Sequence, residues 1–211
     1  MLYIFDMGGV VTNDAYIRSR ICAVLGLSEE AYLRYCGKGG RKEDDLLALA
    51  SDGLLDAKGF WRIFSDRSGM QVRTDWLHWI FHPEVDEDIR ALISKLRAQG
   101  NRIVCGTNTI ESHYRNHIER GDYALFDQTY ASCLMGVSKP DPDFWRIILT
   151  AEDVQAKDAV FIDDRQENVD RLVSQLRDFA AVYAENRDVM RFHYYNPIRM
   201  TNAFEAFSKP W

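Results

Sequence analysis

Three aspartates, a threonine and a lysine in this sequence have side chains that together could bind a metal ion and a phosphate group. Asp6 follows the apolar run LYIF, and Asp163 and Asp164 close the apolar run AVFID. Carboxylate oxygens are the ligands that Mg²⁺ prefers, and Thr107 and Lys139 could hold phosphate oxygens. Without a cation, three neighbouring carboxylates would repel one another and one would take up a proton. The pattern therefore indicates a metal and phosphate site.

Each segment also has an ordinary structural interpretation when it is taken alone. An aspartate before two glycines is typical of a tight turn, and Thr107 or Thr109 could cap the following helix. Lys139 could lie at a solvated helix start, and the pair Asp163 and Asp164 could cap a helix. The segments occur in a fixed order, each at a predicted strand end or helix start, and this combination favours the functional interpretation.

The elements that must position these residues alternate between strand and helix. Apolar runs predict strands, and residues with helical spacing between them predict helices. This alternation predicts an α/β fold with a Rossmann-like parallel sheet, whose strand ends share one edge where ligands collect. The strands are expected at 2–5, 102–106, 128–132, 159–163 and 179–183. The helices are expected at 86–99, 109–121, 140–151, where Pro140 suits the first turn, and 165–177.

The segment between Asp14 and about Glu84 differs from the rest of the chain. It contains no comparable strand, and helical stretches are expected at 15–25, 28–36, 41–51, 56–67 and 72–81. We therefore predict an α/β core made of 1–13 and 85–211, with a helical subdomain, 14–84, inserted after the first strand. The aromatic tail, 184–211, is expected to pack on a surface.

Composition narrows the class of protein. The 211 residues carry a net charge of −6 without a basic run, which argues against a nucleic-acid surface. The four cysteines form no CxxC pair and predict reduced thiols of a cytoplasmic protein. No apolar stretch approaches the roughly 20 residues of a membrane span, so we expect no membrane partner. The oligomeric state does not follow from the sequence.

The motifs FDMGGVV, GTN, SKPDP and FIDD, in this order, resemble those of the haloacid dehalogenase-like (HAD) hydrolase superfamily. The helical insertion resembles the type-1 cap of that superfamily. Among the members of this superfamily, the bacterial α-D-glucose-1-phosphate phosphatase and its relatives look most similar to this sequence. The segments that carry this resemblance are MLYIFDMGGV, HPEV and KLRAQGNRIV. The resemblance implies a Mg²⁺-dependent phosphatase acting on a small phosphorylated metabolite, such as a sugar phosphate.

The resemblance also implies a role for each site residue. Asp6 would attack phosphorus to form an aspartyl-phosphate, and Lys139 would stabilise both Asp6 and the phosphate. Thr107, Asn108 and the backbone N–H groups after Asp6 would bind the phosphoryl group. These implied phosphate-binding residues are Met7, Gly8, Thr107, Asn108 and Lys139. The implied metal-binding residues are Asp6, the Gly8 carbonyl, Asp164 directly and Asp163 through a metal-bound water.

Gly8 departs from the pattern of this superfamily. Most of its phosphatases carry a second aspartate at this position, which protonates the leaving group and later activates water. Such general acid–base help is typically worth ~10²–10⁴-fold in rate. Three interpretations stay open: a leaving group that needs little help, a proton from another residue or from the substrate, or a slow or inactive phosphatase.

The helical subdomain should contribute to substrate selection, but the sequence singles out no residue there. Its polar candidates are Arg18, Arg20, Lys38, Arg41 and Glu43. Trp61, Trp76 and Trp79 are more typical of a subdomain core than of a sugar platform. His113 and His117 have helical spacing but no third ligand, so we expect a surface pair rather than a metal site.

Two other functions use the same scaffold. A 2-haloacid dehalogenase needs no metal, and both the Asp163 and Asp164 pair and Gly8, where dehalogenases tend to carry an aromatic residue, argue against it. A phosphate-binding regulatory protein with a disabled active site is the other alternative, and Gly8 motivates it.

Overall fold

A parallel sheet forms the centre of the protein. The structure is a computed structural model that describes residues 1–13, 17–169 and 193–194. The strand order is β3-β2-β1-β4-β5, and every pair is parallel. The strands are β1 (Leu2–Phe5), β2 (Arg102–Thr107), β3 (Gln128–Ala131), β4 (Ala159–Asp163) and β5 (His193–Tyr194). The predicted α/β fold with a Rossmann-like parallel sheet is confirmed.

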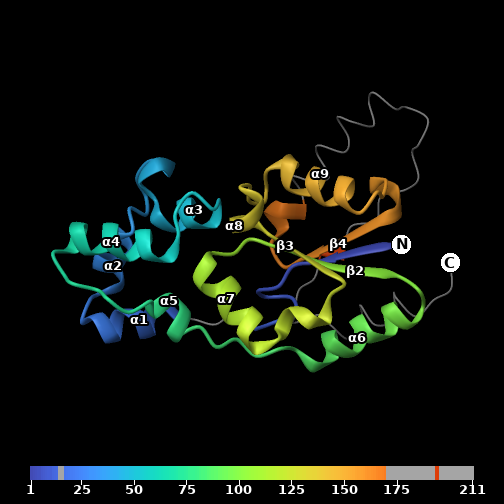
Figure 1. Cartoon of the computed structure of the whole chain (residues 1–211), viewed down its shortest axis with the longest axis horizontal. Helices are drawn as coiled ribbons and strands as arrows, with labels where there is room; N and C mark the ends of the chain where they lie inside the picture. Colours follow the sequence, from blue (N-terminus) through green and yellow to red (C-terminus); the bar gives the residue numbers. More distant parts are fainter. Residues whose placement is uncertain (14–16, 170–192, 195–211) are drawn as a thin grey trace.

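Helices cover both faces of the sheet, which explains why its strands are continuous apolar runs. On one face, α6 (Glu87–Ala98) packs Ile89 and Ile93 against Phe5, and Tyr114 of α7 (Glu111–Arg120) joins the same core. On the other face, α9 (Pro142–Ala151) packs Phe144 against the strands. Figure 1 shows α6 and α7 on one side of the strands and α9 on the other.

The sheet core comes very close to α9 at Gly106. A β-carbon at this glycine would lie 2.8 Å from a methyl group of Ile4 and 3.1 Å from Ile148. Any larger residue at this position would force the helix or the neighbouring strand to move. Gly106 therefore lets α9 sit directly on the sheet, beside the end of β2.

The first turn of α9 corrects one expectation. The helix begins at Pro142, not at Pro140, and Asp141 is its N-cap residue, whose carboxylate accepts the N–H of Asp143. Both prolines precede a helical pattern, but only Pro142 has the capping aspartate directly before it. Lys139 therefore lies in the loop before the helix rather than in its first turn.

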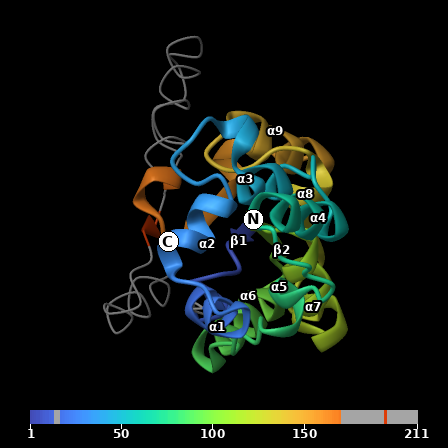
Figure 2. The same ribbon diagram turned by 90° about the vertical axis from the view of Figure 1, so that its left-hand side faces the viewer.

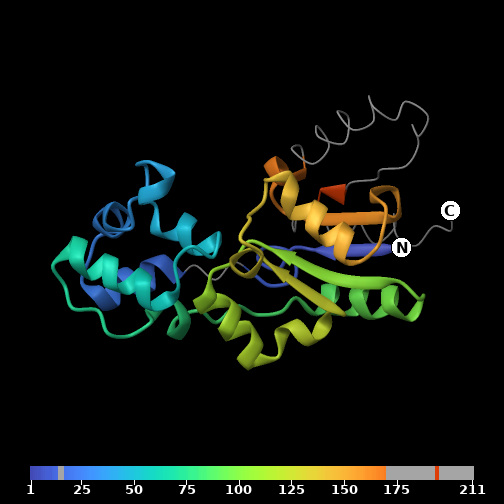
Figure 3. The same cartoon turned by 45° about the horizontal axis from the view of Figure 1, so that its top comes forward.

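Five helices and one 3₁₀ turn form a separate helical lobe, defined here as residues 17–80. The lobe has its own core, in which Tyr32, Leu46, Phe60 and Phe64 are buried. Its elements are α1 (Ile17–Leu25), α2 (Glu29–Tyr35), η1 (Lys42–Asp44), α3 (Leu46–Ser51), α4 (Ala57–Ser68) and α5 (Trp76–Trp79). Figures 1 and 3 show the lobe beyond the end of the sheet toward which β1 runs.

Aspartate side chains begin three of the lobe helices. Asp45, Asp56 and Asp75 each accept backbone N–H groups in the first turn of α3, α4 and α5. Gly69 ends α4 in the left-handed conformation that favours glycine. Figure 2, viewed from the side of the lobe, shows these helices in front of the strands. The lobe therefore lies over the edge where the strands end.

Several expected elements fall partly or wholly outside the described residues. The strand expected at 179–183 lies outside them, as do the end of the helix expected at 165–177 and most of the tail. Helical residues are described at 166–169. Three short elements were not expected from the sequence: η2 (Asp122–Leu125), α8 (Ser132–Met135) and η3 (Ala156–Asp158).

The prediction that His113 and His117 form a pair on the surface is wrong. His117 is 3% exposed, and its Nδ1 lies 2.8 Å from Asp122 Oδ2. His113 stacks on Phe81, with ring centroids 3.9 Å apart and ring planes 8° apart. Because α7 packs between the sheet and the loop after α5, both histidines face protein rather than solvent.

Other expectations concern tryptophan, cysteine and membrane spans. Trp61 is buried in the lobe core and Trp76 packs against it, whereas Trp79 is 65% exposed. All four cysteines are free thiols. Among the described residues, no helix has the length and apolar character needed to cross a membrane.

Candidate active site

Asp6 lies at the end of β1, where the strand turns sharply. Its N–H still donates to the carbonyl of Ile162, so the pairing with β4 extends to Asp6 itself. The chain then turns tightly, and the carbonyl of Met7 accepts hydrogen bonds from the N–H groups of Val11 and Thr12 and from the Thr12 hydroxyl. The Asp6 carboxylate is 7% exposed and accepts the N–H of Met7 at 2.7 Å. The turn therefore fixes the direction of this carboxylate.

Asp163 and Asp164, at the end of β4, meet Asp6. One carboxylate oxygen from each of the three aspartates lies within 4.8 Å of the others. Gly9 makes this approach possible, because a β-carbon there would overlap the carboxylate of Asp164. Gly9 also has a φ of +78°, a conformation that L side chains rarely adopt. Residues about 157 positions apart thus form one carboxylate cluster.

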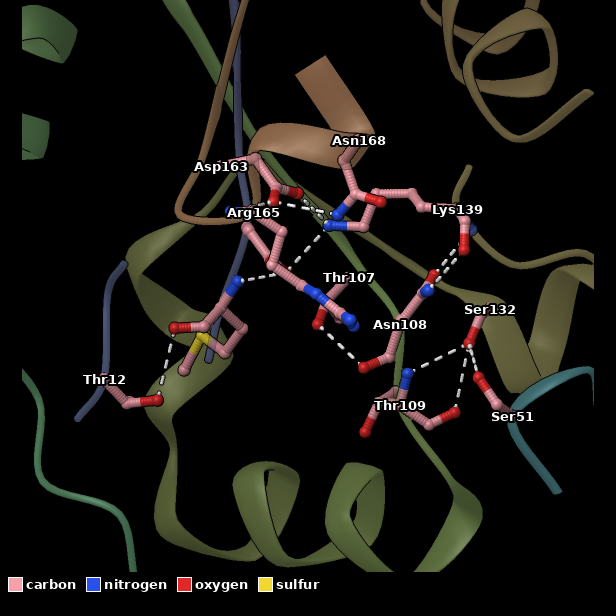
Figure 4. A network of polar contacts seen from close by, with 12 residues as sticks. Thr12, Ser51, Thr107, Asn108, Thr109, Ser132, Lys139, Asp163, Arg165 and Asn168 are labelled. Atoms are coloured by element: carbon pink, nitrogen blue, oxygen red, sulfur yellow. Dashed lines mark hydrogen bonds and ion pairs between the residues drawn. The ribbon is translucent and has the colours of Figure 1, made fainter. Parts of the chain in front are cut away.

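Lys139 is the buried cation beside this cluster. Its Nζ lies 3.0 Å from Asp6 Oδ1 and 2.6 Å from Asp163 Oδ2. Its side chain lies over the rings of Phe144 and Phe161, at 5.7 and 5.3 Å from their centroids. These rings and the two carboxylates hold the ammonium group in one place. Figure 4 shows Lys139 beside Asp163.

Both oxygens of Asp163 already have partners. Oδ2 accepts from Lys139, and Oδ1 accepts from the N–H of Arg165 at 2.9 Å and from the side-chain amide of Asn168 at 2.8 Å. Asp163 is fully buried, and Figure 4 shows Asn168 and Lys139 meeting it. The main role of this carboxylate in the structure is to hold Lys139.

Burial and charge shift the pKa values of the paired groups. Burial raises the pKa of Asp6 to about 6, Lys139 lowers it and Asp163 raises it. Burial by itself lowers the pKa of Lys139, but Asp6 and Asp163 more than offset this, so its pKa is raised. Lys139 is therefore charged at neutral pH, and Asp6, with a pKa of about 6, loses its proton below neutrality.

Thr107 is the last residue of β2 and Asn108 follows it, at the same edge of the sheet. Thr107 is 2% exposed, and its hydroxyl makes only a long contact of 3.5 Å to the carbonyl of Asn108. The Asn108 side chain binds the backbone of Lys139 on both sides: its amide donates to the Lys139 carbonyl at 2.8 Å, and its oxygen accepts the Lys139 N–H at 2.7 Å. Neither Thr107 nor Thr109 caps α7, whose N-cap is Ile110.

The residues of this cluster fit a hard divalent cation. Three carboxylates carry three negative charges when ionised, and Lys139 supplies one positive charge. Burial is the main cause of the raised pKa of Asp6, so a negative charge at this position is unfavourable in the protein alone. Carboxylate oxygens at this spacing are the donors that Mg²⁺ prefers. The Gly8 backbone lies at the same turn and is exposed.

Some residues of the site did not follow from the sequence. Asn168, which holds Asp163, lies five positions after it, in the helical residues 166–169, and local spacing did not indicate this contact. Ser132 is fully buried and bonds both the N–H and the carbonyl of Thr109. It lies in α8, which the sequence pattern did not predict, so no signal pointed to it.

Four of the five polar candidates in the lobe contact other residues of the lobe. Lys38 lies 3.2 Å from Asp45 and Arg41 lies 3.2 Å from Asp44. Arg18 faces Glu29, Arg20 donates to the carbonyl of Ile80, and Glu43 is exposed. No described contact brings any of these five side chains to the carboxylate cluster.

Comparison with known families agrees with the fold and the motif order. Residues 1–170 match the family described as haloacid dehalogenase-like hydrolase. The resemblance inferred from the motifs is thus confirmed at the level of the family. The narrower resemblance to α-D-glucose-1-phosphate phosphatase stays a prediction.

Individual relatives are more distant. A sesquiterpene phosphatase, astK, from Aspergillus oryzae is 33% identical over 85 residues, which are 40% of this chain and 43% of that protein, so the chain spans less than half of that relative's length. A predicted HAD-like family hydrolase from Porphyromonas gingivalis has a TM-score of 0.67 at 21% identity, covering 82% of this chain and 86% of its own.

A HAD family enzyme from Bacteroides thetaiotaomicron, solved with magnesium and inorganic phosphate, has a TM-score of 0.65 at 20% identity, covering 82% of this chain and 89% of its own. At these identities the two solved structures show a shared fold.

Proposed function

This chain belongs to the haloacid dehalogenase-like hydrolase family, and from this premise we propose that it is a Mg²⁺-dependent phosphatase of small phosphorylated metabolites. One observation carries the proposal: a buried carboxylate, Asp6, faces Lys139 at 3.0 Å and lies within 4.8 Å of two further carboxylates. The phosphatase named among the relatives, and the magnesium and phosphate bound to a structural neighbour, support it.

Asp6 is the proposed nucleophile. An oxygen of its carboxylate forms a bond to phosphorus while the bond from phosphorus to the ester oxygen breaks, and the leaving group takes its proton from water or from the substrate. Water then hydrolyses the aspartyl-phosphate, which releases phosphate and restores the carboxylate. Because Asp6 is fixed by the N–H of Met7, little reorganisation is needed for attack.

Lys139 and the loop after β2 are proposed to stabilise the phosphoryl group. The Lys139 ammonium is close enough to Asp6 to reach a phosphate oxygen bound there. Thr107 would donate its hydroxyl, and its single long contact leaves it able to turn toward a ligand. Since the side chain of Asn108 is engaged with Lys139, a phosphate contact from Asn108 would come from its backbone N–H, as from Met7 and Gly8.

Asp6, Asp164 and the Gly8 carbonyl are the proposed direct ligands of Mg²⁺. Asp163 is assigned an indirect role because both of its oxygens have protein partners. When bound, Mg²⁺ would offset the charge of the carboxylates and of the phosphoryl oxygens.

The helical lobe is proposed to act as the type-1 cap, with the bounds 14–84 expected from the sequence. Its position over the strand ends supports this assignment, because substrate bound at Asp6 would lie between the sheet and the lobe (Figures 1 and 3). A sugar phosphate of the α-D-glucose-1-phosphate type and a cytoplasmic location stay predictions.

A phosphate-release screen tests the proposal. Sugar phosphates, nucleotides, prenyl phosphates and phospho-acids are each incubated with the protein, with and without Mg²⁺. We expect Mg²⁺-dependent release from at least one class and a loss of at least about 10³-fold in Asp6→Asn. The substitution Asp158→Asn, at an exposed position outside the cluster, is the matched control. Activity that survives Asp6→Asn would contradict the nucleophile assignment.

The two alternative functions have their own outcomes in this screen. Chloride release from 2-chloropropionate without Mg²⁺ would identify a haloacid dehalogenase. Binding of a phosphate mimic to the Asp6 site, without turnover on the whole panel, would identify a phosphate-binding regulatory protein.

A further inference from the structure

A chain of three serine hydroxyls connects the helical lobe to the two loops that carry the proposed catalytic residues. Ser51, the last residue of α3, lies 3.2 Å from the hydroxyl of Ser132 and 2.9 Å from the hydroxyl of Ser138. Ser132 binds Thr109 in the loop after β2, and Ser138 directly precedes Lys139. Ser51 therefore contacts both loops from the lobe side (Figure 4 shows Ser51 and Ser132).

The number of protons on the three serine hydroxyls determines which hydroxyl donates each hydrogen bond and which accepts it. A hydroxyl has one proton to donate. Ser132 donates its proton to the carbonyl of Thr109 at 3.1 Å and accepts the N–H of Thr109 at 2.9 Å. Ser51 must therefore donate to Ser132, and Ser138 must then donate to Ser51. Each of the three serine hydroxyls thus donates one hydrogen bond to a defined acceptor.

Ser51 is the only member of this chain that belongs to the lobe. Without its hydroxyl, Ser132 keeps both of its bonds to Thr109, but Ser138 loses the oxygen that accepts its proton. Ser138 precedes Lys139, whose backbone is otherwise held by Asn108. Loss of the hydrogen bond between Ser138 and Ser51 would therefore loosen the backbone next to Lys139.

The packing around Ser51 is close enough to keep this geometry fixed. A β-carbon at Gly53 would overlap the carbonyl of Cys133, so the end of α3 lies directly on α8. Ser132 is fully buried, and Ser51 and Ser138 are half-buried. A partly desolvated hydrogen bond is electrostatically stronger than one in open water.

We propose that Ser51 is a positioning residue of the reaction, through which the docked lobe sets the place of Lys139 by way of Ser138. This inference rests on the proposed function, because Lys139 matters to the reaction only if Asp6 receives a phosphoryl group. Ser51 itself touches neither the carboxylate cluster nor any reacting atom.

Steady-state kinetics with Mg²⁺ and a substrate from the screen test the proposal. Ser51→Ala should lower kcat by about three- to tenfold, the effect of one lost hydrogen bond, with KM nearly unchanged because no substrate contact is removed. Ser51→Thr keeps a hydroxyl and should restore kcat. Ser138→Ala should lower kcat in the same way, and the double variant should be no worse than Ser51→Ala, since both remove one bond.

Ser112→Ala is the matched control. Its hydroxyl also bridges α7 and the lobe, to Asp75 at 3.1 Å, but has no contact with Ser132 or Ser138. We expect wild-type kcat in this variant. Equal losses of kcat in Ser112→Ala and Ser51→Ala, or wild-type kcat in Ser51→Ala, would overturn the proposal. If Ser51→Ala does not fold, Ser138→Ala decides by the same comparison with Ser112→Ala.

Hydrogen exchange separates this inference from the proposed function, because it needs no substrate. The N–H of Lys139 donates to Asn108 and should be protected in the wild type. Its exchange should become faster in Ser51→Ala and not in Ser112→Ala. The absence of phosphatase activity would contradict the proposed function. An unchanged exchange rate of the Lys139 N–H in Ser51→Ala would overturn the positioning role of Ser51.

Discussion

Asp6 combines a buried position with an excess of negative charge around it. Its pKa of about 6 means that ionisation in the folded state is harder than in the unfolded chain, where the reference value is 3.8. A raised acid pKa stabilises the fold only below the unfolded value, and this contribution is lost as the pH rises through the folded value. The ionised carboxylate therefore costs the metal-free protein stability at neutral pH.

We predict that Asp6→Asn raises the melting temperature of the metal-free protein above pH 6. The shift of about two pKa units corresponds to roughly 3 kcal/mol of unfolding free energy, or a rise of about 5 °C or more for a chain of this size. The rise should shrink as the pH falls from 6 to 4. Differential scanning calorimetry over this range, with a chelator present, measures it.

Added Mg²⁺ is the control for this prediction. Because a bound cation offsets the charge of Asp6, Mg²⁺ should raise the melting temperature of the wild type more than that of Asp6→Asn. A variant that melts below the wild type at pH 8, with chelator, would contradict the prediction.

Gly8 leaves open space beside Asp6. Apart from its chain neighbours, no described residue has a heavy atom within 4 Å of the position that a β-carbon at Gly8 would occupy, and Gly8 is exposed. The β-carbon of an aspartate fits there without displacing backbone. The glycine is therefore not required by packing.

We predict that Gly8→Asp accelerates hydrolysis of phosphate esters with poor leaving groups. General acid catalysis typically contributes 10²–10⁴-fold, and an unoptimised acid should give at least about tenfold on an alkyl phosphate. p-Nitrophenyl phosphate, whose leaving group needs no proton, should gain little. The ratio of kcat/KM for the two substrates measures the effect.

Gly8→Asn matches the size of the aspartate without its acid and is the control. An equal gain in Gly8→Asn, or no change in the substrate ratio for Gly8→Asp, would show that the missing carboxylate does not limit the reaction.

At this scale, the sequence indicated the residues that end an apolar strand or directly follow it, because strand ends can be read from local patterns. Asp6, Thr107 and Asp163 are of this kind. It did not indicate Ser51, whose partners Ser132 and Ser138 lie 81 and 87 positions away. A hydroxyl contact over that distance depends on how the lobe docks, and local periodicity carries no information on docking.

The turn after β1 is the element that sets the shape of the site. It brings the carboxylate of Asp164 over Gly9, where a side chain would collide with it. Gly9 has both a positive φ and this close contact, whereas Gly121, the C-cap of α7, has nearly the same φ of +77° with no atom within 4 Å of its missing β-carbon. A substitution at Gly121 would therefore cause backbone strain alone, whereas one at Gly9 would cause both backbone strain and a steric clash.

We predict that Gly9→Ala weakens Mg²⁺ binding by at least about tenfold, because Asp164 must move, and also destabilises the fold. Gly121→Ala should cost about 1 kcal/mol of stability from strain alone and leave Mg²⁺ affinity unchanged. Isothermal titration with Mg²⁺ and chemical denaturation measure both effects. Equal Mg²⁺ affinities in the two variants would contradict the role assigned to Gly9.

Element boundaries show where sequence patterns stop being informative. The start of α9 was misplaced because two prolines, at 140 and 142, both suit a first turn, and only the hydrogen bond of Asp141 distinguishes them. The histidines of α7 were misjudged because the sequence ESHYRNHIER is polar on all sides. Its buried face is set by Phe81 and Tyr123, which come from other segments.

The described part of the molecule comprises a sheet with two covered faces and a lobe with a third core. Several contacts cross the junction between the sheet and the lobe. Glu111 accepts the N–H of Ala57 at 2.7 Å, and His78 lies 3.0 Å from the carbonyl of Ser112. Together with the serine chain, they tie the lobe to the sheet on two sides.

We predict that the lobe and the sheet unfold in one transition. Phe64→Ala, in the lobe core, should lower the unfolding free energy by about 3–5 kcal/mol. The decrease should be the same whether unfolding is followed in the lobe or in the sheet. Phe144→Ala, in the core beneath α9, is the matched variant. The fluorescence of Trp61 in the lobe and of Trp145 in α9, each kept as the sole tryptophan, follows the two parts.

Two midpoints in denaturant, with only the Trp61 signal shifted by Phe64→Ala, would contradict this prediction. Coincident midpoints for both probes in both variants would agree with a single cooperative unit.

The central place of β1 in the sheet has a consequence for the order of assembly during protein synthesis. Leu2 is flanked by Arg102 on one side and by Ala159 on the other. The ribosome makes β1 first, but its second neighbour emerges only about 160 residues later, whereas the lobe helices can associate as soon as they are made. Nascent chains that stop before β4 should therefore carry a folded lobe while Asp6 still lacks its place in the sheet.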